Sequence, residues 1–304
     1  MTDMKELEDL LDLCMARTEG VLSKEHWEQL AALKGSARMR RGFVGEILAV
    51  ALAGATGSGK SSLVNAMCGQ DVAAVGVRRP TTSRSLAVVP REISADLSLF
   101  VDRLNVDDTI VVESLDDVVF VDLPDMDSTV REHRTAVEAA LRVVDAVVWV
   151  LDPEKYADVV IHEEFLAPLS QYADQFVFCL NKADRIGPDV AGVTTSLKEH
   201  LIRDGYLDPE IVSTTATSEG GSDMAIESLM RSLDARLDHK RTAQMKVALD
   251  VRRLASDSWA RLNANFEDLA GDERETAAVA MASFVSLGVA AFALHHDLAE
   301  PAGS

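Results

Sequence analysis

Residues 54–62 read GATGSGKSS and directly follow the apolar run at residues 47–53. They fit the pattern G-x-x-x-x-G-K-[ST], which describes a phosphate-binding loop when a strand precedes it and a helix follows it. Glycine lets the backbone adopt positive φ and approach a ligand closely, so that successive N–H groups face an anion. The sequence therefore predicts a nucleoside triphosphate site. A glycine-rich turn that happens to carry a lysine is the alternative.

Two side chains of this loop have specific expected roles. Lys60 should reach the outer phosphates of the nucleotide, and Ser61 should place its hydroxyl on a magnesium ion held by those phosphates. The remaining positions should contact the nucleotide as parts of the loop. The predicted nucleotide-binding residues of the loop are Gly54, Ala55, Thr56, Gly57, Ser58, Gly59, Lys60, Ser61 and Ser62.

Composition and charge restrict the class of protein. At 304 residues the chain could hold two domains, or one large domain with extensions. Apolar residues make up 47% of it, which indicates a folded α/β protein rather than a disordered chain. The net charge of −20 disfavours nucleic acid as a partner and also disfavours broad attraction to an anionic lipid surface.

The cysteines and the N-terminus bear on localisation. Cys14, Cys68 and Cys179 are scattered without metal-ligand spacing, which is typical of reduced thiols packed as small apolar groups. The N-terminus is acidic and amphipathic, unlike a signal peptide. We therefore expect a cytoplasmic protein. A peripheral or anchored position at the inner face of the cell membrane is the alternative.

Hydrophobic patterning predicts three regions. Residues 1–43 carry leucines at helical spacing and form an expected helical N-terminal extension. In residues 44–240 apolar strand-like runs alternate with amphipathic stretches, which predicts an α/β domain with a mostly parallel sheet and helices on both faces. Residues 241–304 form an expected helical C-terminal region.

The expected strands and helices of the α/β domain follow from these runs. Strands are expected at residues 47–53, 85–89, 97–101, 109–113, 118–121, 146–151, 176–180 and 211–215. Helices are expected at residues 129–144, 193–203 and 223–237.

A second acidic group for magnesium is expected at the end of a strand beside the phosphate loop. The run VVFV at residues 118–121 continues as Asp122, Leu123, Pro124 and Asp125. Asp122 is therefore the candidate magnesium ligand. A surface aspartate that caps a turn is the alternative.

A third motif follows the predicted strand at residues 176–180, where the chain reads Asn181, Lys182, Ala183 and Asp184. A carboxylate at Asp184 can accept hydrogen bonds from both N1–H and the exocyclic amine of guanine, whereas adenine offers a mismatched edge. The aliphatic stem of Lys182 would lie along the base. A turn after a strand is the alternative, but the position downstream of Asp122 favours guanine recognition.

Taken in order, these motifs resemble a P-loop GTPase domain of the translation-factor-related class, in the branch of Era-like and dynamin-like proteins. The phrases GATGSGKSSLVNA, GVRRPTTS, VDLPDMDS and WVLDPEKYAD are similar to those of bacterial dynamin-like or Era-like GTPases with an N-terminal helical segment. The resemblance implies GTP and GDP as ligands, Mg²⁺ as cofactor and GTP hydrolysis as the reaction. It implies Lys60, Thr82 and Asp122 as catalytic residues and Ser61, Thr82 and Asp122 as magnesium ligands.

Two further segments gain a role from the resemblance. The polar residues 76–84 match the first switch, where Thr81 or, by preference, Thr82 would sense the outer phosphate through magnesium. An ordinary loop is the alternative. Asn181, Lys182 and Asp184 match the guanine motif, and the loop after residues 211–215 would contact the base through Thr215 and Ala216.

The chain departs from the family pattern at positions that affect hydrolysis. Asp125 replaces a glycine whose N–H would bond the outer phosphate, and its charge should repel that phosphate. No glutamine follows to orient the attacking water. Gly57 replaces the Asn or Ser that would support a potassium ion, and Thr56 replaces a glycine beside which an arginine finger fits. We therefore predict slow intrinsic hydrolysis that self-association or a partner raises.

Residues 276–294 carry no charge and would span about 28 Å as a helix. That length is marginally enough to cross a bilayer, but the flanks show no positive bias. Two interpretations of this segment remain. It is a helix packed on the N-terminal helices or on a second copy of the chain, or it contacts a membrane.

Three functions compete. The first is a GTPase that acts as a conformational switch, with a homo-oligomer, a partner protein or a membrane as its partner. The second is a nucleotide-gated scaffolding module that hydrolyses little GTP. The third, an Era-like ribosome-associated GTPase, is disfavoured by the net charge.

Overall fold

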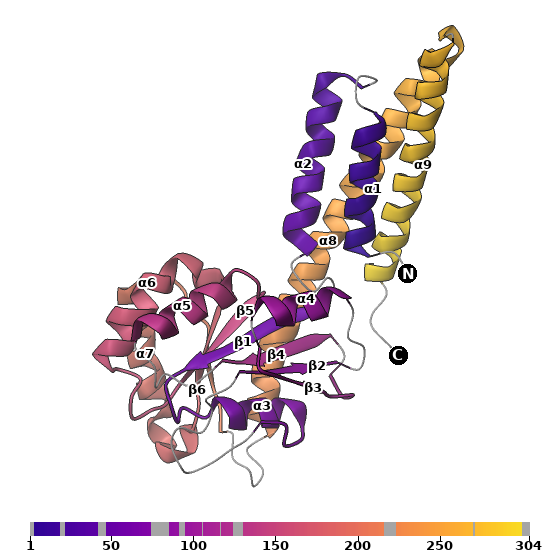
Figure 1. Ribbon diagram of the computed structural model, residues 1–304. Helices are drawn as coiled ribbons and strands as arrows, with labels where there is room; N and C mark the ends of the chain where they lie inside the picture. The colour runs from indigo at the N-terminus through magenta and orange to yellow at the C-terminus, as the bar shows by residue number, and fades with distance from the viewer. Residues whose placement is uncertain are drawn as a thin grey trace. The chain divides into compact units, whose positions relative to one another are not determined.

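The computed structural model describes residues 3–18, 22–41, 47–73, 85–90, 95–104, 106–115, 117–123, 130–215, 223–269 and 271–299. The chain divides into two compact units. One unit is Ile47–Arg236, and the other, called the helical unit below, combines Met1–Glu46 with Leu237–Ser304. Figure 1 traces both along the chain.

The first unit contains a sheet of seven strands in the order β3-β2-β4-β1-β5-β6-β7. Figure 1 labels β1 to β6 of this sheet. β1 pairs in parallel with β4 and β5, and β5, β6 and β7 continue the parallel arrangement. β2 pairs antiparallel with β4 and parallel with β3. The predicted mostly parallel sheet is confirmed. Its strands are β1 (Leu48–Gly54), β2 (Leu86–Val89), β3 (Asp108–Val111), β4 (Val118–Asp122), β5 (Ala146–Leu151), β6 (Phe176–Leu180) and β7 (Ile211–Ser213).

The central strands are buried along their whole length. Every residue of β1, β4, β5 and β6 is buried. Because successive side chains of a strand point to opposite faces, this burial means that both faces of the sheet are covered. The helices of the chain outside the N-terminal segment are α3 (Lys60–Cys68), α4 (Ala95–Arg103), α5 (Val130–Leu141), α6 (Ala167–Leu169), α7 (Val190–Asp204), α8 (Asp223–Asn265) and α9 (Asp272–Ala299).

The predicted strand at residues 97–101 is wrong, since these residues lie in helix α4. Leu97 and Phe100 are fully buried, whereas Leu99 is 58% exposed. A spacing of three residues places two side chains on one face of a helix, while a strand would have put Leu97 and Leu99 on the same face. The apolar content of the run concealed this helical period.

Short helical segments account for a stretch that the sequence analysis assigned to no element. η1 (Ile161–Leu166) is π-helical, and it continues through α6 into the 3₁₀ turn η2 (Ser170–Gln175). Further 3₁₀ turns are η3 (Ala183–Arg185), η4 (Gly187–Asp189) and η5 (Phe266–Asp268).

The helical unit is built from α1 (Met4–Arg17), α2 (Lys24–Arg41), α9 and part of α8. Asp3 caps α1 by accepting a hydrogen bond from the N–H of Glu6 at 2.8 Å. Apolar residues at helical spacing then bury one face of α1 against α2 and α9. Members of the shared core include Met4, Leu7, Leu11, Leu30, Val251, Phe284, Leu287 and Leu294.

The three cysteines are free and buried. Burial raises the pKa of Cys14 to about 12, against a smaller lowering by Arg17, and raises the pKa of Cys179 to about 12. Both side chains therefore stay protonated at neutral pH and pack as small apolar groups.

Candidate functional site

The phosphate-binding loop lies between the end of β1 and the start of α3. Gly54, Gly57 and Gly59 adopt φ of 148°, 78° and 97°. A Cβ at Gly59 would lie 2.3 Å from Nδ2 of Asn181, and a Cβ at Gly54 would lie 2.3 Å from the carbonyl oxygen of Val150. The loop therefore requires glycine at both ends, because it is pressed against the ends of two neighbouring strands.

The first turn of α3 supplies two polar side chains to the loop. Lys60 is buried, and its Nζ donates to the carbonyl oxygen of Gly54 at 3.0 Å. The Lys60 side chain therefore crosses the loop, and its ammonium group contacts the first residue of the loop. The hydroxyl of Ser61 donates to Oδ2 of Asp122 at 2.8 Å.

Asp122 reaches Ser61 because of the sheet register. β4 pairs with β1, and Asp122 stands opposite Leu52, two residues before the loop begins. A hydroxyl and a carboxylate that meet in this way are oxygen ligands of the kind that Mg²⁺ prefers. The residues present therefore fit a magnesium ion.

The loop also has unused hydrogen-bonding capacity. The hydroxyl of Ser58 is buried, and it has no hydrogen-bond partner within the described part of the chain. Buried polar groups are normally paired, so this hydroxyl is available to a ligand held in the loop.

Asn181 ties the end of β6 to the phosphate-binding loop. It is fully buried, and its Nδ2 donates to the carbonyl oxygen of Ser58 at 3.0 Å. Its Oδ1 accepts a hydrogen bond from the hydroxyl of Thr214 at 3.1 Å. Thr214 follows β7 and was not among the predicted site residues. No feature of the sequence distinguishes it from the adjacent Thr215, which was predicted instead.

Lys182 makes a second connection to the loop. It adopts φ of 59°, and its Nζ donates to the carbonyl oxygen of Gly57 and to Oδ2 of Asp152, the latter at 2.7 Å. Burial acts to raise the pKa of Asp152, but hydrogen bonds from Lys182 and the N–H of Glu154 outweigh it and lower that pKa. Asp152 is therefore an ionised partner of Lys182.

Asp152 was also missed by the sequence analysis. The available signal was its position directly after β5, since β5 lies between β1 and β6 and its carboxyl end must adjoin both motifs. A pocket of about 150 Å³ opens at this place, lined by loop residues 55–58 and by Asp152, Lys155, Lys182 and Arg185 among others.

The remaining predicted residues occupy different surroundings. Asp184 lies in η3 with its side chain exposed, and the turn is held by a hydrogen bond from the N–H of Ala183 to the carbonyl oxygen of Thr214 at 3.0 Å. Thr215 is half-buried after β7, as are Thr56 and Ser62 in and after the loop. The predicted residues Thr81, Thr82 and Ala216, and also Asp125, lie outside the described residues.

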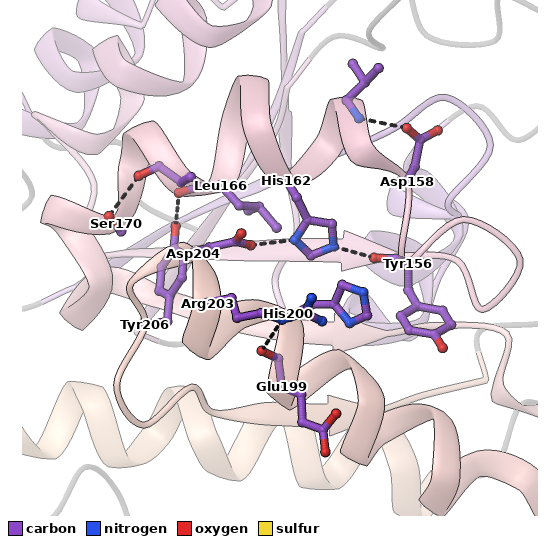
Figure 2. A network of polar contacts seen from close by, with 12 residues as sticks. Tyr156, Asp158, His162, Leu166, Ser170, Glu199, His200, Arg203, Asp204 and Tyr206 are labelled. Carbon is purple, nitrogen blue, oxygen red and sulfur yellow. Dashed lines mark hydrogen bonds and ion pairs between the residues drawn. The ribbon is translucent and has the colours of Figure 1, made fainter.

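The loop that carries Asp152 is anchored by a buried histidine (Figure 2). His162 of η1 is bound through Nδ1 to Oδ2 of Asp204 on α7 and through Nε2 to the carbonyl oxygen of Tyr156 at 2.7 Å. Nε2 donates to the carbonyl oxygen, which can only accept, and Nδ1 faces the carboxylate. The histidine thus fixes the backbone four residues after Asp152 to α7.

Residues 49–182 match the family described as 50S ribosome-binding GTPase. The chain contains a P-loop GTPase domain. The predicted GTPase resemblance is confirmed, and GTP binding and hydrolysis are the activities of this domain. The match begins in β1 and ends at Lys182, so it includes the phosphate-binding loop, Asp122 and the first two residues of the guanine motif.

Several solved structures are similar to this chain at low sequence identity. A chain of an oligomerised bacterial dynamin pair, described as a mechanism for long-range sensing and tethering of membranes, is 15% identical with a TM-score of 0.49. That match covers 87% of this chain and 48% of the dynamin chain, so this chain spans about half its length. No curated protein matches the chain.

Two other solved GTPases are similar over less of the chain. Era in complex with MgGDPNP and 16S ribosomal RNA is 20% identical, with a TM-score of 0.43 over 62% of this chain and 56% of that chain. Toc33 from Arabidopsis thaliana with Mg²⁺ and GMPPNP is 13% identical, with a TM-score of 0.46 over 72% of this chain and 95% of that chain.

Proposed function

We propose that the chain is a GTP-hydrolysing switch whose turnover is slow alone and is raised by self-association or a partner. The observation that carries the proposal is the double connection of the phosphate-binding loop, to Asp122 through Ser61 and to the guanine motif through Lys182 and Asn181. Phosphate and base recognition therefore meet on one short loop.

In this proposal each residue has a defined task. Lys60 binds the outer phosphates, while Ser61 and Asp122 hold Mg²⁺ together with Thr82 of the first switch. The ion, when bound, neutralises charge on the phosphates. Asp184 accepts the two guanine N–H groups, which its exposed position leaves accessible.

Slow turnover is proposed from the chemistry of the residues after Asp122. The chain offers Asp125 and no glutamine in this segment, so a backbone carbonyl, the switch threonine or a partner's group would orient the attacking water. A second copy or another protein would then complete the site.

The proposed GTPase domain extends over residues 44–240, with helical extensions at 1–43 and 241–304.

A nucleotide-gated scaffolding role, with a membrane or protein partner, is the second candidate. The observation behind it is helix α9, which is long and apolar enough to cross a membrane by length and composition alone, although 44% of its most apolar window is buried. In either role the protein would act in the cytoplasm or at the inner face of the cell membrane.

The test is phosphate release from GTP and from ATP across a wide range of protein concentrations, with and without anionic vesicles. We expect hydrolysis of GTP only, with a rate per molecule that rises with protein concentration. A fast rate that is independent of concentration would contradict the proposed need for a partner. Asp184→Asn should weaken GTP binding and leave ATP binding unchanged; equal effects on both would contradict guanine recognition by Asp184.

A further inference from the structure

Helix α9 exposes a face without a single charged side chain between Thr276 and Leu294. Val289 is 64% exposed and Phe292 50% exposed on this face. Surface helices usually carry charge on their exposed side, and a contiguous exposed apolar patch marks an interaction surface. The exposed residues, called the α9 face below, are Ala278, Val279, Ala282, Val285, Ser286, Val289 and Phe292.

A hollow of about 400 Å³ adjoins the α9 face within the helical unit. Its other wall is α8, which contributes Trp259 at one end and Arg252 at the other. The Arg252 guanidinium lies 4.8 Å from the ring centre of Phe292. The surface is therefore an apolar face with a recess beside it, bounded by one cation.

Side-chain size and charge are distributed unevenly along the α9 face. Its N-terminal half presents the small residues Ala278 and Ala282 beside Val279, and its C-terminal half presents Val289 and the larger Phe292. Glu275 is exposed one turn before Val279 and so extends the face at its N-terminal end. The neighbouring cation Arg274 is bound to the carbonyl oxygens of Phe266 and Glu267. The N-terminal end of the face therefore presents the Glu275 carboxylate, and the C-terminal end presents bulky side chains beside Arg252.

We propose that the α9 face binds a second copy of this chain, with the two α9 helices antiparallel. A two-fold axis near Ala282 and Val285 would set each Val289 against the partner's Ala278 and each Arg252 beside the partner's Glu275. Large side chains then meet small ones, and opposite charges meet at both ends of the contact. The inference rests on the self-association in the proposed function and names its surface.

Charge argues against lipid as the occupant of the α9 face. Helices that lie on anionic membranes carry Lys and Arg along their polar side. In α9 the single arginine, Arg274, stands between Glu273 and Glu275, and no lysine is present. Along the stretch of α8 that borders the hollow, residues 250–259, Arg252 and Arg253 are balanced by Asp250 and Asp257. In a dimer, Glu275 of one copy can pair with Arg252 of the other, whereas an anionic lipid surface would repel the Glu275 carboxylate.

The test compares the oligomeric state of the full chain and its variants by analytical ultracentrifugation, with GDP and with a non-hydrolysable GTP analogue. Val289→Glu, Glu275→Arg and Arg252→Glu should each weaken the dimer by about tenfold or more. The double variant E275R/R252E should recover most of the wild-type affinity, which a merely misfolded surface would not do. Leu13→Glu, an exposed apolar position on α1 in the same unit, should have no effect.

A monomer at all concentrations, or a charge reversal that restores nothing, would overturn the inference. Cosedimentation of a monomeric wild type with vesicles, abolished by Val289→Glu, would instead assign the face to lipid. Hydrolysis that still rises with concentration in Val289→Glu would overturn the α9 face while preserving the proposed self-stimulation. If dimers form through the α9 face but the rate of GTP hydrolysis does not change, the proposed dimer surface stands and the proposed stimulation of hydrolysis by self-association is wrong.

Discussion

The hydroxyl of Ser61 and the carboxylate of Asp122 lie 2.8 Å apart, although 61 residues separate them along the chain. The parallel pairing of β1 with β4 brings them together, since it places the end of one strand beside the loop that follows the other. The contact is the structural basis of the first prediction.

Removing either partner of this contact should impair hydrolysis more than nucleotide binding. Ser61→Ala and Asp122→Asn should each lower the rate of GTP hydrolysis by about 100-fold, because each removes an oxygen ligand suited to Mg²⁺. A magnesium titration of phosphate release measures this. Thr195→Ala, which removes an exposed hydroxyl on α7, serves as the control. Equal rates in all variants would exclude the metal role.

Gly59 should be irreplaceable for a reason that goes beyond its backbone conformation. Gly59→Ala should lower the free energy of unfolding and abolish tight GDP binding, because the new Cβ would collide with Asn181. Gly69→Ala is the matched control: Gly69 ends the same helix with φ of 66°, and nothing lies within 4 Å of its Cβ position. It should cost only about 1 kcal/mol of backbone strain. Chemical unfolding and GDP titration of both variants provide the comparison.

Asp152 should act on the nucleotide through Lys182. Asp152→Ala should speed GDP release, and its effect should not add to that of Lys182→Ala, since the two residues share one contact. Stopped-flow release of a fluorescent GDP measures both rates. Glu154→Gln is the control, because its 3.8 Å pair with Arg185 is exposed. Fully additive effects would contradict the positioning role.

Acidity should weaken the Asp152 contribution. The pKa of Asp152 is lower in the folded chain than in the unfolded one, so its contribution to stability is present above the unfolded pKa. That contribution is lost as the pH falls through the folded pKa. The stability difference between wild type and Asp152→Asn should therefore shrink in acid, as thermal unfolding at a series of pH values can show.

His162 should stabilise the unit Ile47–Arg236 against unfolding. His162→Ala leaves the carboxylate of Asp204 and the carbonyl of Tyr156 without their donor, and it should lower the free energy of unfolding by about 3 kcal/mol. Asp208→Asn, which removes an exposed pair with Lys198, should change it by less than about 0.5 kcal/mol. Urea unfolding distinguishes the two; similar values would show that the histidine is dispensable.

The sheet and the main motifs were predictable because their signals are local. The loop from Gly54 to Ser61 carries its own conformational requirements, and Asp122 and Asn181 each follow a continuous apolar run. In a parallel sheet the carboxyl ends of such runs converge, so order along the chain is enough to predict that the motifs meet.

The parts that were missed depend on contacts that no local pattern encodes. Asp152 is a single aspartate after a strand, and only the pairing of β5 with β6 shows that it faces Lys182. Thr214 likewise becomes relevant only through its hydrogen bonds with Asn181 and with the N–H of Ala183. Helix α4 was taken for a strand because an apolar run of five residues is too short to distinguish the two periods.

In the proposed binding mode, the hydrogen bond from Asn181 to the carbonyl of Ser58 would make the two ends of a bound nucleotide energetically dependent on each other. A displacement of the turn that holds the base would pull on the loop that holds the phosphates, and the reverse is equally true. Guanosine and triphosphate measured separately should therefore contribute binding free energies that sum to less than the value for intact GTP.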